Sequence, residues 1–404
     1  MGSCDGAGGH VSSRPVQPVI TAYGLCNCMG LTTAEVLAAL RAGRSGLAAC
    51  PAEFGLAWPA TVGMLPGELP GLPAGLADYD SRQARVAALG LSELMGPLAR
   101  ACARWGRERV AVVLGTSTGG IGASEAAYVH HARHGRLPPG FTAERSHALD
   151  ATVPLVRALA GLEGPGYVLS TACSSSARVF AAAQRLLLLG VCDAVLVGGV
   201  DSLCQLTVRG FASLEVLAPG PCRPFSRERA GINIGEGAAY CLLERTGEGP
   251  AVLLGVGESS DAHHMTSPHP EGLGARLAMA RALAQAGLEP AAVDHVNAHG
   301  TGTRQNDSAE GAAIAGLFGP GMAVAATKGY TGHQLGAAGA TEALFAVAAI
   351  AEGVAPASAG ADPLDETIPV RVTTERTPMR TRVVLSNSFA FGGSNVSVLV
   401  GGAP

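Results

Sequence analysis

The stretch Ser170-Thr171-Ala172-Cys173-Ser174-Ser175-Ser176 lies between a short apolar run and a long Ala/Leu-rich segment, and the rest of the chain is organised around it. Residues 166–169 predict a buried strand, residues 177–189 a helix, and residues 193–197 a second strand. Cys173 is therefore expected where a strand passes into a helix N-terminus. The free amide groups and the helix dipole at such a place favour a thiolate over a thiol. A buried cysteine that only packs is the alternative that this stretch leaves open.

Composition indicates a protein with a large core and few charges. The chain has 404 residues, of which 48% are hydrophobic and 15% charged, and its formal net charge is -4. A chain of this length can form a large hydrophobic core in one or two domains. Because it has no long basic run, we expect no nucleic-acid partner. The apolar stretches are interrupted by polar residues, so no membrane insertion is expected.

The cysteines and the N-terminus indicate the compartment. Ten cysteines occur without a disulfide-like framework, which predicts reduced thiols and a cytoplasmic protein. Residues 1–18 are rich in Gly, Ser and Pro and lack an apolar signal core, so we expect a disordered tail there.

Strands alternate with helices along the chain, which predicts an α/β fold with a mostly parallel sheet. The second half repeats the plan of the first, with strands at 252–258 and 324–327 and helices at 275–286 and 340–352. We therefore expect an internal duplication, with one half at 19–250 carrying the cysteine and the other at 251–404.

Two histidines follow apolar strands in the second half. His299 lies in Asn297-Ala298-His299-Gly300-Thr301-Gly302-Thr303, and His333 lies in Gly332-His333-Gln334-Leu335-Gly336. Sites of open α/β sheets gather at the carboxyl ends of strands, so both are candidates for one site. A Cys with two His could bind zinc, but the short-spaced ligand pairs of such sites are missing, so no metal is predicted there.

Nucleophilic catalysis by the cysteine is the favoured interpretation of these three residues. Lys328, just before the second histidine, and Glu342, on the helix after it, could form an ion pair that orients the histidines. An ordinary solvated pair is the alternative for these two residues.

Four motifs occur in a fixed order. They are Thr171 to Ser175, His299 to Thr303, Lys328 with residues 332–339, and residues 387–395, which read Asn-Ser-Phe-Ala-Phe-Gly-Gly-Ser-Asn. Together they resemble the β-ketoacyl-acyl-carrier-protein synthases, the Cys-His-His condensing enzymes of fatty acid and polyketide synthesis. The resemblance covers about residues 19–400. It implies an acyltransferase of thiolase-like α/β fold, with two similar halves in a five-layer αβαβα arrangement.

The resemblance also assigns roles to residues. Cys173 would take the acyl chain, and His299 and His333 would donate hydrogen bonds, as neutral imidazoles, to the malonyl thioester oxygen while carbon dioxide leaves. The backbone N–H groups of Cys173 and Phe389 would form the oxyanion hole. Phe389, in one turn with Phe391, would gate the substrate routes.

Further assignments concern binding. Thr301 and Thr303 match residues that hydrogen-bond the pantetheine arm, and Lys328 with Glu342 matches a supporting ion pair. Some members hold a structural monovalent cation at the places of Asn297, Glu342 and Ser388. The resemblance implies no cofactor, because the substrates are carried on the phosphopantetheine of acyl carrier protein.

The chain departs from the common pattern at some positions. Ala390 stands between the two Phe residues where many members have Gly, and it would be strained if that position needed a positive φ. Residues 21–24 and 231–237 look more like synthases of aryl polyene pathways.

Two other classes of protein are alternatives. A non-catalytic partner of the chain-length-factor type typically lacks the cysteine that this chain keeps. A thiolase would need a second cysteine near residues 389–395, where this chain has none. The implied partners are acyl carrier protein and a second ketosynthase-like chain, in a homodimer or in a heterodimer with a chain-length factor.

Overall fold

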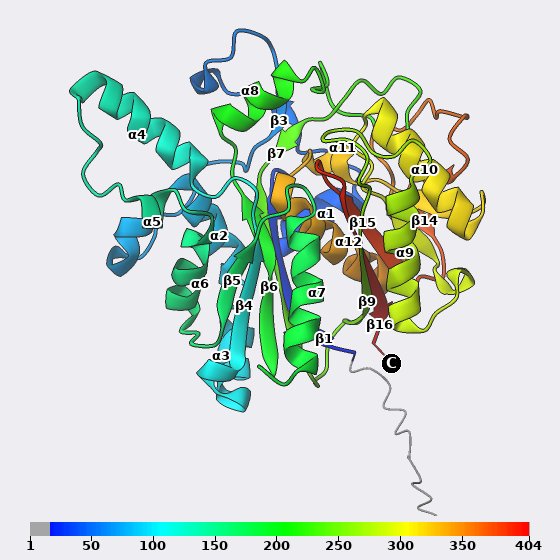
Figure 1. Ribbon diagram of the computed structural model, residues 1–404, viewed down its shortest axis with the longest axis horizontal. Coiled ribbons are helices and arrows are strands. Elements are labelled where there is room, and N and C mark those ends of the chain that lie inside the picture. The colour runs from blue at the N-terminus through cyan, green and yellow to red at the C-terminus, as the bar shows by residue number, and fades with distance from the viewer. Residues whose placement is uncertain (1–16, 404) are drawn as a thin grey trace, which may run out of the picture.

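The computed structural model describes residues 17–403, so the prediction of a disordered tail at 1–18 lies almost wholly outside the described residues. Eleven strands are hydrogen-bonded in the order β13-β11-β10-β15-β16-β9-β1-β8-β6-β4-β5 (Figure 1). The strands of the N-terminal half are β1 (Val19–Asn27), β4 (Val110–Gly115), β5 (Gly166–Leu169), β6 (Ala194–Asp201) and β8 (Gly237–Glu244). Those of the C-terminal half are β9 (Ala251–Ser260), β10 (His295–Asn297), β11 (Ala323–Ala325), β13 (Arg371–Val372), β15 (Val383–Phe389) and β16 (Ser394–Gly402).

The two halves of this sheet repeat one pattern of strand directions. In the N-terminal half β4 runs parallel to β5 and β6, whereas β8 runs antiparallel to β6 and β1. In the C-terminal half β10 runs parallel to β11 and β15, whereas β16 runs antiparallel to β15 and β9. The expected repetition is therefore present. The expectation of a mostly parallel sheet was wrong, because the middle strands pair antiparallel from β15 to β6. Among these pairs, β15 and β16 form a hairpin, a short connection that forces antiparallel pairing.

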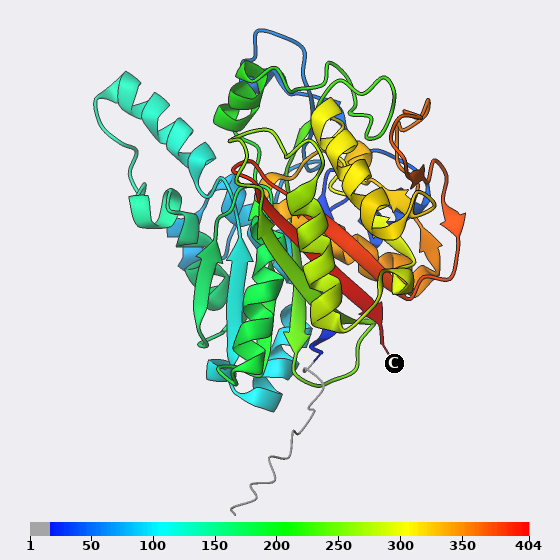
Figure 2. The same ribbon diagram turned by 45° about the vertical axis from the view of Figure 1, so that its right-hand side comes forward.

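Helices lie on both sides of each sheet and between the sheets (Figures 1 and 2). The central layer consists of α7 (Ser175–Leu188) and α12 (Ala338–Glu352), which pack against each other. Outside the N-terminal sheet lie α2 (Arg82–Ser92) and α6 (Thr152–Ala160), and outside the C-terminal sheet lie α9 (Leu273–Ala286) and α10 (Arg304–Phe318). This is the predicted five-layer arrangement.

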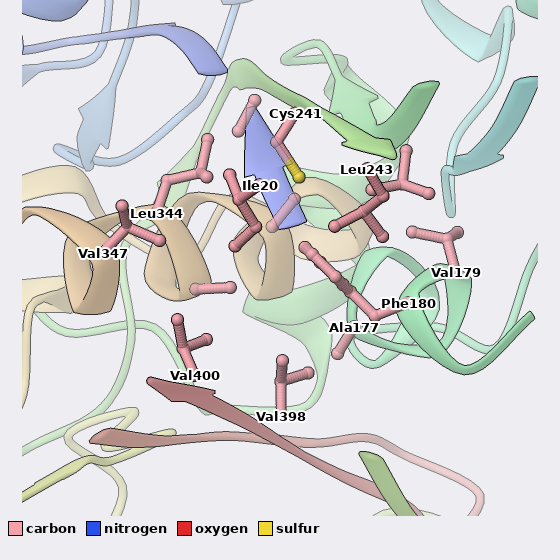
Figure 3. Packing of buried hydrophobic residues seen from close by; sticks show 14 of the residues in the cluster. Ile20, Ala177, Val179, Phe180, Cys241, Leu243, Leu344, Val347, Val398 and Val400 are labelled. Atoms are coloured by element: carbon pink, nitrogen blue, oxygen red, sulfur yellow. The ribbon is translucent and has the colours of Figure 1, made fainter. Parts of the chain in front are cut away.

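The central layer holds the main core. In Figure 3, Phe180 of α7 and Leu344 of α12 meet Ile20 of β1, Cys241 of β8 and Val398 of β16. Because both faces of this layer are covered by strands, α12 is apolar nearly all round, whereas α7 is amphipathic. The segment Leu335–Glu352 is by itself long and apolar enough to cross a membrane, but 83% of it is buried inside the protein, where its hydrophobicity serves the core.

Smaller elements surround these layers. They are α1 (Thr33–Arg41), α3 (Met95–Trp105), α4 (Ile121–His134), α5 (Ala143–Ser146), α8 (Gln205–Ser213), α11 (Lys328–Thr331), β2 (Ala48–Ala49), β3 (Thr61–Gly63), β7 (Ile234–Gly235), β12 (Val354–Ala355) and β14 (Thr377–Pro378). Helical periodicity extends over residues 81–105, but two helices stand there, α2 and α3, bent by 70°. Thr32 caps α1 as predicted, since its side chain accepts a hydrogen bond from the amide of Glu35.

Candidate active site

Cys173 lies in the tight turn between β5 and α7, as predicted. Several hydrogen bonds hold the turn, among them one from the amide of Thr171 to Ser175 Oγ at 2.9 Å and one from the amide of Ser175 to the carbonyl of Ala172 at 3.1 Å. Ala172 has a φ of +51°, a conformation that L-residues rarely adopt. Strained backbone of this kind persists only where its surroundings hold it, and it often occurs at functional sites.

His299 and His333 reach the same place from the C-terminal half. His299 follows β10. The backbone of His333 is fixed against the strand β7 by a 2.7 Å bond from its amide to the carbonyl of Asn233 and a 2.9 Å bond from the amide of Gly235 to its own carbonyl. The two imidazole rings lie edge to face, with centroids 5.3 Å apart. Both rings and Cys173 line one pocket of about 300 Å³, so the fold brings the three predicted residues together.

Lys328 determines which ring nitrogen of His299 carries the hydrogen. Its Nζ lies 3.3 Å from His299 Nδ1 and 2.5 Å from the carbonyl oxygen of His299, and it forms a buried ion pair with Glu342. An ammonium group has only donors, so His299 Nδ1 must accept. His299 Nε2 therefore carries the hydrogen and is available to donate.

Both histidines are held neutral. Burial lowers the pKa of His299 well below its usual value, and the charge of Lys328 adds to this effect. Burial and Lys328 act in the same way on the pKa of His333, and neither ring nitrogen of His333 has a hydrogen-bond partner among the described residues. The expected pair of neutral donors therefore fits this geometry.

The thiol of Cys173 does not behave as the sequence suggested. Burial raises the pKa of Cys173 to about 11, although Lys328 and the backbone N–H groups of Phe391 and Cys173 lower it. The expectation that the helix N-terminus favours a thiolate is wrong here, because the loss of solvent outweighs those favourable groups.

The turn after β15 differs from the expectation in one further respect. The amide that acts on Cys173 belongs to Phe391 and not to Phe389. The ring of Phe389 is buried in the core with its centroid 5.9 Å from the ring of His299, whereas the ring of Phe391 is partly exposed and lies 5.8 Å from Phe211. Both residues line the pocket, and this geometry favours Phe391 over Phe389 for the predicted oxyanion and gating roles.

Ala390 is not strained. The positive φ angles of this turn occur at Gly392 and Gly393, with values of +82° and +76°, and Ala390 is outside that region. An alanine between the two Phe residues is therefore compatible with the turn.

The residues expected to bind substrate line the pocket mouth. Thr301 and Thr303 both line the pocket, and their Oγ1 atoms are 2.9 Å apart. Thr303 also caps α10 by accepting a hydrogen bond from the amide of Asn306 at 3.3 Å. This ties the orientation of its hydroxyl to the helix N-terminus.

The side chains at the predicted cation site offer buried oxygen atoms. Asn297 Oδ1 and Glu342 Oε2 are buried oxygen atoms without a hydrogen-bond partner, and Ser388 is buried on β15. Oxygen atoms of this kind fit a hard monovalent cation. Within residues 17–403 no group of three or more His, Cys, Asp or Glu side chains could hold a metal ion.

Two buried acids near the site were not predicted from the sequence. The carboxylate of Glu310 accepts hydrogen bonds from the amides of His299 and Gly300, both at 2.8 Å, and from Asn387 Nδ2 at 3.1 Å. It fixes the backbone of the first histidine. Asp201 stands at the end of β6. The sequence carries a signal for each acid. Asp201 ends an apolar strand, and Glu310 lies on the helix that follows the His299 motif.

A buried cysteine with two neutral imidazole donors, on a duplicated five-layer α/β fold, defines a thiolase-like acyltransferase. Residues 17–248 match the model of "Beta-ketoacyl synthase, N-terminal domain", and residues 250–362 match "Beta-ketoacyl synthase, C-terminal domain". The chain belongs to the β-ketoacyl synthase family.

Individual relatives agree with this assignment. Nodulation protein E of Rhizobium sp. (strain N33) is 34% identical over 400 residues, which are 93% of this chain and 97% of that protein. The mitochondrial 3-oxoacyl-[acyl-carrier-protein] synthase of Arabidopsis thaliana is 40% identical over 262 residues, 59% of this chain and 57% of that protein.

A solved structure is also similar over almost the whole chain. One chain in the structure of the ketosynthase ApeO in complex with its chain length factor ApeC, from Xenorhabdus doucetiae, has a TM-score of 0.89 and 37% identity, covering 96% of this chain and 98% of that chain.

Proposed function

We propose that this β-ketoacyl synthase lengthens acyl chains on acyl carrier protein by decarboxylative condensation with a malonyl thioester. The observation that carries the proposal is the common pocket of Cys173, His299 and His333, in which both imidazoles are neutral and His299 Nε2 bears a hydrogen. Loss of carbon dioxide supplies the carbon nucleophile, so this chemistry needs no cofactor.

The first step is transfer of the acyl group. Cys173 Sγ attacks the thioester carbonyl of an acyl chain on the phosphopantetheine arm, with Thr301 and Thr303 placed to hold that arm. The carbonyl oxygen becomes an oxyanion, which the amides of Cys173 and Phe391 stabilise. When the intermediate collapses, the carbon–sulfur bond to pantetheine breaks, and the thiol proton of Cys173 ends on the departing pantetheine sulfur.

The second step forms the carbon–carbon bond. The bond between the malonyl carboxylate and its α-carbon breaks, carbon dioxide leaves, and the electron pair remains as an enolate whose oxygen accepts hydrogen bonds from His299 and His333. The α-carbon then attacks the acyl-Cys173 carbonyl, the carbon–sulfur bond to Cys173 breaks, and the departing thiolate takes up a proton from water. Lys328 supports this step by holding His299 in the tautomer that donates from Nε2.

A non-catalytic role is not favoured, because the fold brings the complete Cys-His-His set into one pocket. We propose a heterodimer with a chain-length-factor-like ketosynthase, with a homodimer as the alternative. The heterodimer is supported by the similarity to a chain of the complex of ApeO with its chain length factor, and to the ishigamide ketosynthase/chain length factor structure, which is 27% identical with a TM-score of 0.88. We further propose an aryl polyene pathway, on the basis of the sequence around residues 21–24 and 231–237. A cytoplasmic location is proposed on the basis of the ten cysteines without a disulfide-like framework.

The test uses the variant Cys173→Gln, whose neutral amide can occupy the place of the acyl thioester. It is expected to abolish condensation and to keep or raise release of carbon dioxide from malonyl-carrier protein, measured by mass spectrometry of the carrier. Adding His299→Ala should then slow that release about a hundredfold, because removal of one oxyanion donor costs about 3 kcal/mol. A Gln variant that still condenses chains would rule out Cys173 as the nucleophile. If the parent is inactive in both assays, with candidate partner chains added, the non-catalytic role is correct.

A further inference from the structure

We propose that Asp201 is a positioning residue for His333: its carboxylate clamps the strained backbone just after that histidine onto the turn between β4 and α4. The inference rests on the proposed function, since the relevant property is the placement of a donor for the malonyl thioester. Asp201 forms no hydrogen bond with the ring of His333, and in this role it acts through the backbone amide of Gly336.

The carboxylate is surrounded by donors. From the β4–α4 turn it accepts hydrogen bonds from the amides of Ser117 and Thr118, at 3.0 Å each for the shorter contacts, and from three hydroxyl groups. These hydroxyls are Thr116 Oγ1 at 2.5 Å, Ser117 Oγ at 2.9 Å and Thr118 Oγ1 at 2.6 Å. Backbone N–H groups cannot reverse their role, so this is a cradle for an acceptor.

The remaining donor comes from the histidine loop. The amide of Gly336 lies 2.5 Å from Asp201 Oδ2 and 3.1 Å from Ser117 Oγ. A Cβ atom on Gly336 would stand 2.6 Å from the Ser117 amide nitrogen and 2.7 Å from Asp201 Oδ2. Only glycine permits this close approach. The contact links the C-terminal half to the end of β6, which is two strands from β5, the strand that precedes Cys173.

The clamp secures a strained bend. Leu335, between His333 and Gly336, has a φ of +52°. A leucine in this conformation is held there by its neighbours and relaxes if they release it. On the other side, His333 is anchored by its bonds to Asn233 and Gly235. The loop is thus fixed at both ends, and Asp201 supplies the anchor on the side of the strained residue.

Besides its effect on the backbone, the charge of Asp201 raises the pKa of the Cys173 thiol, but no ion pair among the described residues explains why a carboxylate stands here. It is fully buried, and it has no salt bridge with a Lys, Arg or His side chain within residues 17–403. A buried carboxylate without a counter-ion is costly, and a packed apolar residue would stabilise the strand end better. This free-energy cost has a function if the carboxylate is needed to hold the β4–α4 turn and the amide of Gly336 together.

The experiment separates the two half-reactions. Asp201→Asn keeps the shape but presents an NH₂ group to a cradle of donors. In the Cys173→Gln background it is expected to lower carbon dioxide release from malonyl-carrier protein about tenfold or more, because small displacements of a reacting group are expensive. In protein that keeps Cys173, Asp201→Asn should lower the rate of acyl transfer to the cysteine much less than it lowers carbon dioxide release. The matched control is Asp193→Asn at the opposite end of β6, where the carboxylate pairs with Arg109 and Arg245, and it should leave both half-reactions unchanged.

A second readout does not depend on activity. In protein labelled with ¹⁵N-histidine, Asp201→Asn should shift the ring signals of His333 and leave those of the buried His295 unchanged. Gly336→Ala keeps the carboxylate of Asp201 but pushes the histidine loop away from it. It should also slow carbon dioxide release and shift the His333 ring signals, and it replaces the Asn variant as the test if that variant does not fold.

Equal losses in both half-reactions, or unshifted His333 signals in a folded variant, would overturn the assignment of Asp201. If the parent itself carries out neither half-reaction, the proposed function fails, and the histidine signals alone decide the role of Asp201.

Discussion

Replacing Lys328 by methionine is expected to make the stability of this protein strongly dependent on pH. Lys328 is 1% exposed and its ammonium group forms a buried ion pair with Glu342, which is 3% exposed. Methionine fills most of the volume of the lysine stem but leaves Glu342 without a cation. Removing one partner of a buried pair typically costs about 3–5 kcal/mol while the other stays charged.

The pH dependence follows from Glu342. Burial raises its pKa to about 7 even though Lys328 lowers it, so the pKa must rise further when Lys328 is absent. In the unfolded chain a Glu side chain titrates near pH 4.3, at about its ordinary value. Between these two pKa values the folded state holds a proton that the unfolded state has lost, so stability falls as the pH rises, by up to about 1.4 kcal/mol per pH unit. In the parent this decline ends near pH 7, and in the variant it continues above it.

The assay is urea unfolding of parent and variant at pH 6, 7, 8 and 9. The free-energy difference between them is expected to be smallest at pH 6, where a proton neutralises Glu342, and to reach about 3 kcal/mol at pH 8. The control is the double variant Lys328→Met/Glu342→Gln, which should recover stability at pH 8 and lose the additional slope. A loss that is the same from pH 6 to pH 9, or a double variant no more stable than the single one at pH 8, would refute the reasoning.

Three further outcomes are expected. Release of carbon dioxide by the Cys173→Gln protein should keep its rate as the pH falls from 7.5 to about 6, because His299 and His333 have lowered pKa values and stay neutral there; a decline centred near 6.5 would contradict this. Phe389→Ala should destabilise the protein by about 3–5 kcal/mol as a core truncation, whereas Phe391→Ala should slow acyl transfer with little change in melting temperature; the reverse order would restore Phe389 as the gate. Exchanging sodium and potassium salts for choline should lower the melting temperature, and Asn297→Leu should remove that difference; no salt effect in the parent would argue against a cation site.

The sequence by itself determined the elements and the chemical groups. The apolar run before Ser170 and the Ala/Leu-rich segment after Ser176 have lengths and spacings that only a strand and a helix satisfy, so the position of Cys173 in a turn was predictable. His299 could be identified because it stands in a glycine-rich turn at the end of β10. His333 also stands in a glycine-rich turn, but the short helix α11 separates it from β11, which the sequence did not indicate. These are local properties, written in neighbouring residues.

The tertiary structure decided everything that depends on what surrounds a group. Cys173 stands next to a helix N-terminus in the sequence, but its pKa is set by burial under residues from both halves of the chain. The choice of Phe391 over Phe389 as the residue whose amide meets the thiol depends on how one hairpin turns, and the strand directions depend on which strands become neighbours. Asp201 shows the same limit, because the donors around it come from residues 116–118 and 336, more than a hundred residues apart. Solvation and hydrogen-bond partners arise between distant segments, so they are fixed only when the chain is packed.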